Sequence, residues 1–100
     1  MTAPVVLVSG AGGGIGAAAV RRFASAGWRI VAVDLDPAAL ERLESAAVIA
    51  RLQGDIRSAD ACRSLVERAV AAAGRLDALR RLRALRGDGA LGARVVEGER

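Results

Sequence analysis

The sequence predicts an α/β domain in which short buried strands alternate with helices around a parallel sheet. Two β-branched apolar runs, Val5 to Val8 and Ile30 to Asp34, have the composition of central strands. Each run is followed by a segment with helical character, and this alternation is typical of a parallel sheet. Right-handed crossovers then predict about three strands in the spatial order 3-2-1.

The first strand leads directly into a glycine-rich turn and the start of a helix. The segment from Val5 to Gly16 reads VVLVSGAGGGIG, and the alanines after it favour a helix over Gly14 to Ser25 that stops at Gly27. At such a junction glycines let a pyrophosphate approach the backbone, and the free N–H groups of the helix face the anion. The segment therefore predicts a dinucleotide-binding site.

The spacing of the glycines separates this loop from two related motifs. Gly10, Gly14 and Gly16 fit the pattern G-x-x-x-G-x-G, whereas the third glycine of G-x-G-x-x-G would fall on Ile15. A P-loop requires a lysine, and the chain has none. A flexible low-complexity turn is the alternative interpretation, and the position of the loop between a strand and a helix argues against it.

The segment SGAGGGIG resembles the TGxxxGIG loop of the short-chain dehydrogenase/reductase family, with Ser9 where threonine is usual. The resemblance runs from about Val5 to Leu79. It implies a partial Rossmann fold, which is a doubly wound parallel sheet, and a dinucleotide cofactor. The loop residues that it assigns to cofactor binding are Ser9, Gly10, Gly12, Gly13, Gly14, Ile15 and Gly16.

The second strand ends on Asp34, close to the offset of roughly 20 residues at which an acid meets the adenosine ribose. A carboxylate accepts hydrogen bonds from the 2′- and 3′-hydroxyls but repels a 2′-phosphate, so Asp34 favours NAD over NADP. Leu35 supports this choice, because NADP-dependent members of the family often place an arginine there. Alternatively, Asp34 only opens the turn before the next helix.

A second resemblance follows the third strand, which we expect at Val48 to Leu52 after a short helix that begins with Asp36 and Pro37. In the family, an aspartate and an aliphatic residue at this place contact the adenine ring. Asp55 and Ile56 match that pair residue for residue. An Asx turn that caps the coming helix is the alternative interpretation of Asp55.

The pattern changes after the third helix, which is expected between its N-cap Ser58 and its stop at Gly74. Leucines then recur every three residues, so no fourth strand is predicted. We expect a partial dinucleotide-binding domain at 1–79 and an irregular or helical Arg/Leu-rich tail at 80–100. The first strand would then be an exposed edge open to oligomerisation, and the far face of the sheet would lack its helix layer.

The residues that carry hydride transfer in the family are missing. The family uses a tyrosine and a lysine four residues apart, with a serine and an asparagine, and this chain contains no Tyr, Lys, His or Asn. We therefore assign no catalytic residue and no metal site. The sequence predicts the N-terminal portion of a short-chain oxidoreductase, truncated or frame-altered near Leu79 and inactive alone. A non-enzymatic NAD-binding module and an interaction protein acting through the tail remain alternatives.

The net charge and the cysteine content limit the classes of partner and the cellular location that we expect. The net charge is +4, and the excess arginines are scattered among leucines in the tail without a lysine or an aromatic residue to stack on bases. This argues against nucleic-acid binding. The single Cys62 excludes an internal disulfide, and neither a secretory signal nor a membrane span is apparent, so we expect a cytoplasmic protein.

Overall fold

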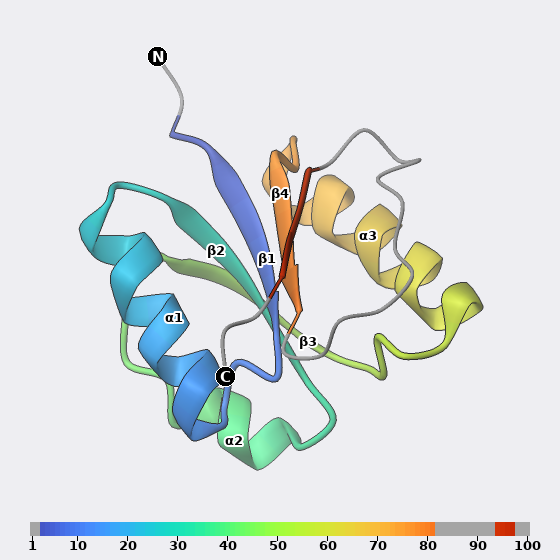
Figure 1. The fold of residues 1–100 in the computed structure, drawn as a ribbon, viewed down its shortest axis with the longest axis horizontal. Helices are drawn as coiled ribbons and strands as arrows, with labels where there is room; N and C mark the ends of the chain where they lie inside the picture. The colour runs from blue at the N-terminus through green and yellow to red at the C-terminus, as the bar shows by residue number, and fades with distance from the viewer. Residues whose placement is uncertain (1–2, 82–93, 98–100) are drawn as a thin grey trace.

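The computed structural model of the chain describes residues 3–81 and 94–97. In chain order the elements are β1 (Val5–Ser9), α1 (Gly14–Ser25), β2 (Arg29–Asp34), α2 (Pro37–Glu41), β3 (Val48–Gln53), α3 (Ala59–Ala73), β4 (Ala78–Arg81) and β5 (Arg94–Glu97). The three predicted strands are confirmed, each one residue longer than expected. Strand and helix alternate as far as β4 (Figure 1).

The predicted strand order is confirmed within a larger sheet. The order is β3-β2-β1-β4-β5, and each neighbouring pair is parallel. All of β1 is buried. Val5 lies opposite Arg29 and Ser9 opposite Val33, so β1 and β2 end side by side at the same edge of the sheet. That edge is where a ligand binds in a doubly wound fold.

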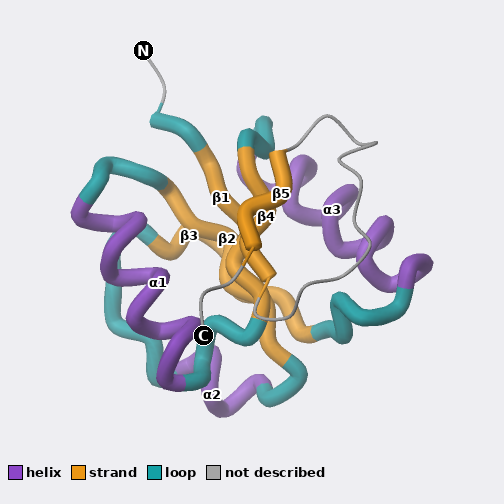
Figure 2. Tube along the Cα trace, in the orientation of Figure 1, coloured by secondary structure: helices purple, strands orange, loops and turns teal. Residues whose placement is uncertain are grey.

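Helices cover both faces of the sheet, with α1 and α2 on one side and α3 on the other (Figure 2). Val6 and Val8 point into the cluster that α1 and α2 cover, and Val5 and Leu7 point into the cluster under α3. The expectation that the far face lacks a helix layer is therefore wrong. The far face is covered by α3, because the apolar stripe of this helix, formed by Leu65, Val66 and Ala69, packs against the sheet there.

The expectation that no fourth strand forms is also wrong. β4 runs parallel to β1, with Ala78 opposite Val6 and Leu79 opposite Leu7. Its side chains Ala78 and Leu79 are buried, and the amide of Asp77 donates to the carbonyl of Val5 at 2.9 Å. Strand pairing with β1 thus outweighs the helix-like spacing of the leucines, since Ala78 and Leu79 supply buried apolar side chains to the sheet.

β1 consequently has a neighbour on both sides, and the edge proposed for oligomerisation is covered. The backbone of Arg94–Glu97 forms β5 beside β4, where an irregular or helical tail was expected. The rest of that tail, 82–93 and 98–100, lies outside the described residues. Among the helices of the described residues, none has the length and apolar character needed to cross a bilayer.

Candidate functional site

The loop between β1 and α1 is a compact turn tied to the neighbouring strand. Gly10 has a φ of 64°, a left-handed conformation that favours glycine. Its carbonyl accepts a hydrogen bond from the amide of Gly13 at 3.1 Å. The amide of Ala11 donates to the carbonyl of Val33 at 3.0 Å, which holds the loop against the end of β2.

The glycines of this loop have different surroundings. A Cβ atom on Gly16 would overlap the carbonyl oxygen of Gly10, so the close packing of α1 on the loop requires glycine there. A Cβ atom on Gly14 would meet nothing within 4 Å, and one on Gly13 would lie 3.6 Å from the Gly10 oxygen. Gly13 and Gly14 therefore leave open space at the helix start, as the approach of a diphosphate requires.

The N-terminus of α1 is suited to an anion. Gly13 is its N-cap and supplies no side-chain cap, and the first turn carries no acidic residue. The first helical hydrogen bond runs from the amide of Ala17 to the carbonyl of Gly13 at 2.7 Å. The first N–H groups of a helix have no partner within it and carry the positive end of the helix dipole. These amides fit a phosphate group.

Asp34 joins this loop to the end of β2. Its Oδ2 accepts a hydrogen bond from the amide of Gly12 at 2.9 Å, and its Oδ1 accepts one from the amide of Asp36 at 3.0 Å. An ionised carboxylate offers about four lone-pair positions, so acceptor capacity remains on each oxygen. The turn interpretation of Asp34 is thus correct for Oδ1, and each oxygen of the same carboxylate can still accept a further hydrogen bond.

Helix α2 packs directly on the loop through a contact that sequence reasoning missed. A Cβ atom on Gly12 would overlap the Cβ atom of Ala39 and lie 2.9 Å from its backbone carbonyl carbon. The predicted start of α2 is confirmed, since the Asp36 side chain accepts from the amide of Ala38 at 3.0 Å and Pro37 follows. A small residue in the first turn after such a cap is the only signal that could have indicated Ala39.

Two apolar side chains are exposed at this edge of the sheet. Leu35 is 55% exposed directly after Asp34, and Ile15 is 47% exposed in the first turn of α1. Within the described residues they are two of the four large hydrophobic side chains that are exposed. Ser9, at the end of β1, is by contrast buried. Each of the two exposed side chains is available for apolar contact with a ligand at this edge.

Asp55 and Ile56 lie in the turn after β3, close to the end of β2. The amide of Gly54 donates to the carbonyl of Asp34 at 3.1 Å, which fixes this turn beside the end of β2. Ile56 is half-buried and packs against the cluster under α3. The Asx turn expected at Asp55 does form, because its Oδ1 accepts from the amide of Arg57 at 3.0 Å. The N-cap of α3 is the predicted Ser58, whose Oγ accepts from the amide of Ala61 at 3.2 Å, so Asp55 itself does not cap the helix.

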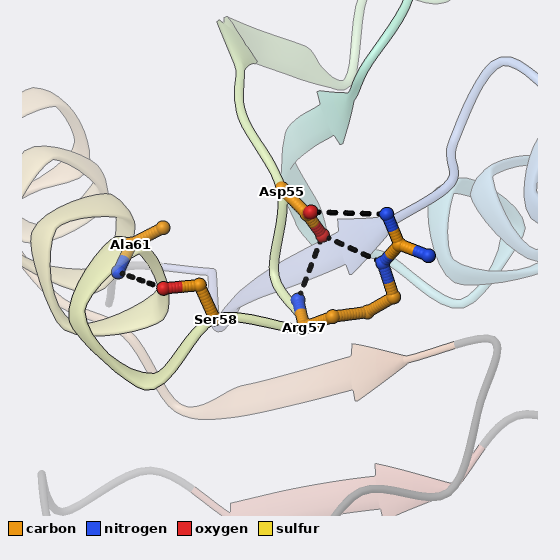
Figure 3. A network of polar contacts seen from close by, with 4 residues as sticks. All are labelled: Asp55, Arg57, Ser58 and Ala61. Carbon is orange, nitrogen blue, oxygen red and sulfur yellow. Dashed lines mark hydrogen bonds and ion pairs between the residues drawn. The ribbon is translucent and has the colours of Figure 1, made fainter.

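The carboxylate of Asp55 is instead held by Arg57, a residue that the sequence did not single out (Figure 3). Oδ1 accepts from the backbone amide of Arg57 at 3.0 Å and from its Nε at 2.9 Å, while Oδ2 accepts from its terminal NH2 nitrogen at 3.0 Å. The side-chain hydrogen bond from Arg57, reinforced by its amide, lowers the pKa of Asp55. Like any aspartate near neutral pH, the ionised group only accepts hydrogen bonds.

These features define a doubly wound, Rossmann-like domain whose glycine loop and acidic strand end meet at the carboxyl edge of the sheet. The chain belongs to the short-chain dehydrogenase family, because the family model described as short chain dehydrogenase matches residues 4–84. The match extends beyond Leu79, where the resemblance seen in the sequence ends. β4 accounts for part of this extension.

Named relatives share this region. Cis-1,2-dihydrobenzene-1,2-diol dehydrogenase of Pseudomonas putida is 42% identical over 77 residues, which are 75% of this chain and 28% of that protein. A short-chain dehydrogenase/reductase from Burkholderia phymatum, solved in complex with NAD, is 30% identical with a TM-score of 0.70 over 78% of this chain and 30% of its own. A 3-ketoacyl-(acyl-carrier-protein) reductase from Brucella melitensis, complexed with NADH, is 35% identical with a TM-score of 0.65, over 77% of this chain and 33% of its own. The chain thus spans about a third or less of each relative.

Proposed function

We propose that the chain binds a nicotinamide dinucleotide at the edge formed by the β1–α1 loop and the ends of β2 and β3. The observation that carries this proposal is the position of Asp34, whose carboxylate contacts the Gly12 amide at 2.9 Å. This hydrogen bond holds the loop suited to a phosphate next to the carboxylate suited to a ribose. Structural relatives with NAD and NADH bound support the same class of ligand.

The diphosphate would lie at the start of α1. Gly13 and Gly14 leave room for it, and the unpaired amides of the first helical turn would donate to its oxygens. Ser9, Gly10 and Gly16 would define the conformation of the loop on the side away from the ligand. Ile15 would cover the ligand from the helix side, since its side chain is exposed there.

We further propose that NAD is preferred over NADP. The Asp34 carboxylate would accept hydrogen bonds from the two ribose hydroxyls through its remaining lone pairs, whereas a 2′-phosphate would bring like charges together. Leu35 supplies no cation to offset that repulsion, and neither Gly12 nor Gly13 carries a side chain.

In the same proposal the chain is the cofactor-binding portion of a short-chain oxidoreductase and is inactive alone. The bound cofactor would accept or donate a hydride at its nicotinamide ring. The chain has no Tyr, Lys, His or Asn, and it therefore offers no side chain tuned for proton transfer near neutral pH. The alternative role of the tail as a partner-binding segment concerns residues 80–100, of which 82–93 and 98–100 lie outside the described residues.

The test is calorimetric titration of the chain with NAD and with NADP. We expect NAD to bind at least about tenfold more tightly, because each such charge-assisted hydrogen bond contributes about 1.5–3 kcal/mol. The variant Asp34→Asn keeps an oxygen for the Gly12 amide but loses the charge, and it should bring the two dissociation constants together. Asp60→Asn, at a fully exposed side chain of α3, is the matched control and should change neither.

Two results would count against this proposal. Absence of NAD binding at millimolar concentration would refute dinucleotide binding altogether. An unchanged ratio in Asp34→Asn would leave dinucleotide binding standing but would show that Asp34 does not select the cofactor.

A further inference from the structure

The turn after β3 contains a guanidinium–carboxylate pair. Its carboxylate, Asp55, stands where members of the family contact the adenine ring, whereas its guanidinium, Arg57, has no role in the proposed function. Arg57 and Asp55 make three hydrogen bonds, of which two go to Oδ1 and one to Oδ2. The pair is partly exposed, with side-chain exposures of 55% for Arg57 and 37% for Asp55. Exposed ion pairs contribute little to stability, so their geometry is the more informative property.

The position of this pair follows from the order of the strands. The loop suited to phosphate follows β1, Asp34 ends β2, and the turn with Asp55 follows β3, which is the next strand across the sheet. A nucleotide carries its phosphate, ribose and base in that same sequence. A ligand with its phosphate at α1 and its ribose at Asp34 therefore places its base toward Asp55, which is tied to the end of β2 through Gly54.

The hydrogen bonds to Arg57 determine what the Asp55 carboxylate can still do. Three of its roughly four lone-pair positions are occupied, and the remaining one is on Oδ2. An ionised carboxylate only accepts hydrogen bonds, so an acceptor that faces the 6-position of a purine suits a 6-amino group and repels the carbonyl oxygen that replaces it in a 6-oxo purine. An aspartate is ionised near neutral pH, and the hydrogen bonds from Arg57 lower the pKa of Asp55 further.

We propose that Arg57 is a positioning residue that holds Asp55 with a single open acceptor, so that the site selects a purine with a 6-amino group over one with a 6-oxo group. This inference rests on the proposed dinucleotide binding and specifies how its base is recognised. Arg57 acts through Asp55. Without the guanidinium, the carboxylate can rotate away from an oxo group, and selectivity is lost.

The experiment compares the affinity of the chain for NAD with that for its analogue in which hypoxanthine replaces adenine. We expect the wild-type chain to bind NAD about tenfold more tightly, as the loss of one charge-assisted hydrogen bond implies. Arg57→Met should reduce this ratio to about threefold or less. Arg57→Lys, which keeps the charge but not the two-pronged contact, should give an intermediate ratio.

Arg63→Met is the matched control, because Arg63 is an exposed arginine of α3 that approaches Asp60 only to 3.8 Å. It should leave both affinities unchanged. Circular dichroism would check that Arg57→Met is folded. A wild-type ratio near one, or an undiminished ratio in folded Arg57→Met, would overturn the role of Arg57 while dinucleotide binding stands. If the wild-type chain binds no NAD, the proposed function fails and this inference fails with it.

Discussion

Glycines in the β1–α1 loop are required for different physical reasons. At Gly16 the space for a side chain is taken by the backbone of Gly10, whereas Gly14 faces open space. A substitution at the first position should disturb packing, and one at the second should disturb only a ligand that approaches there.

Gly16→Ala should therefore lower the free energy of unfolding by about 1–3 kcal/mol, the usual cost of overpacking. Gly14→Ala should leave it unchanged or raise it by up to about 1 kcal/mol, since alanine is the better helix former. It should nevertheless weaken NAD binding. Urea denaturation and calorimetry of both variants provide the measurement, and equal stability losses would contradict this division of roles.

The glycine pattern and the acid at the end of β2 could be recognised in the sequence because both are short-range signals at a fixed spacing. Arg57 could not, since an Asp-x-Arg pair in an irregular turn has no periodicity that marks it. Ala39 was missed for another reason. Its contact with Gly12 forms only when α2 folds back on the loop.

At the scale of the elements, caps made the helices predictable. Ser58 and Gly74 delimit α3 as expected, and Gly74 has the left-handed φ of 87° that a helix stop favours. β4 was missed because the strand is short and its burial depends on β1, to which it is distant in sequence. Local periodicity therefore carried no information about this pairing.

Helix α2 depends on β3 for its C-terminal end. Arg51 of β3 donates from Nε to the carbonyl of Leu40 at 3.1 Å and from its terminal NH2 nitrogen to that of Leu43 at 2.9 Å. A five-residue helix is too short to be stable alone. Arg51→Met should cost about 1–2 kcal/mol of stability and also weaken NAD binding, because α2 supports the loop at Gly12. Arg42→Met, an exposed arginine next to α2, is the control for denaturation and titration; equal effects would contradict this role.

The stability that the contact between β4 and β1 contributes should decrease at acidic pH. Asp77 accepts from the Val5 amide at 2.9 Å, and the side-chain hydrogen bond from Arg75, together with that amide, lowers the pKa of its carboxyl from the ordinary value. Because the pKa of this carboxyl is lower in the folded chain than in the unfolded chain, the ionised group stabilises the fold fully above the unfolded pKa. That stabilisation is lost as the pH falls through the folded pKa. Asp77→Asn should therefore flatten the fall in stability below about pH 4, measured by urea denaturation. A slope as steep as that of the wild-type chain would refute this.

The molecule as a whole consists of two apolar clusters on opposite faces of one sheet. Val6 and Val8 belong to one cluster, and Val5 and Leu7 to the other, so β1 contributes to both. The candidate site lies at the end of this same strand. A ligand that joins the loop after β1 to the ends of β2 and β3 should therefore stabilise the sheet as a unit.

NAD at 100 times its dissociation constant should stabilise the folded chain by about 2.7 kcal/mol, which corresponds to a rise in Tm of about 10 °C or more for a domain of this size. Hydrogen exchange should slow first at 10–16, 34–36 and 54–57, where the ligand would contact the chain. NADP at equal concentration is the control and should give a smaller rise. Equal rises for both ligands would contradict the cofactor preference. Slower exchange confined to 10–16 would mean that the ligand contacts the loop without reaching Asp34 or Asp55, and that the strand ends do not act together.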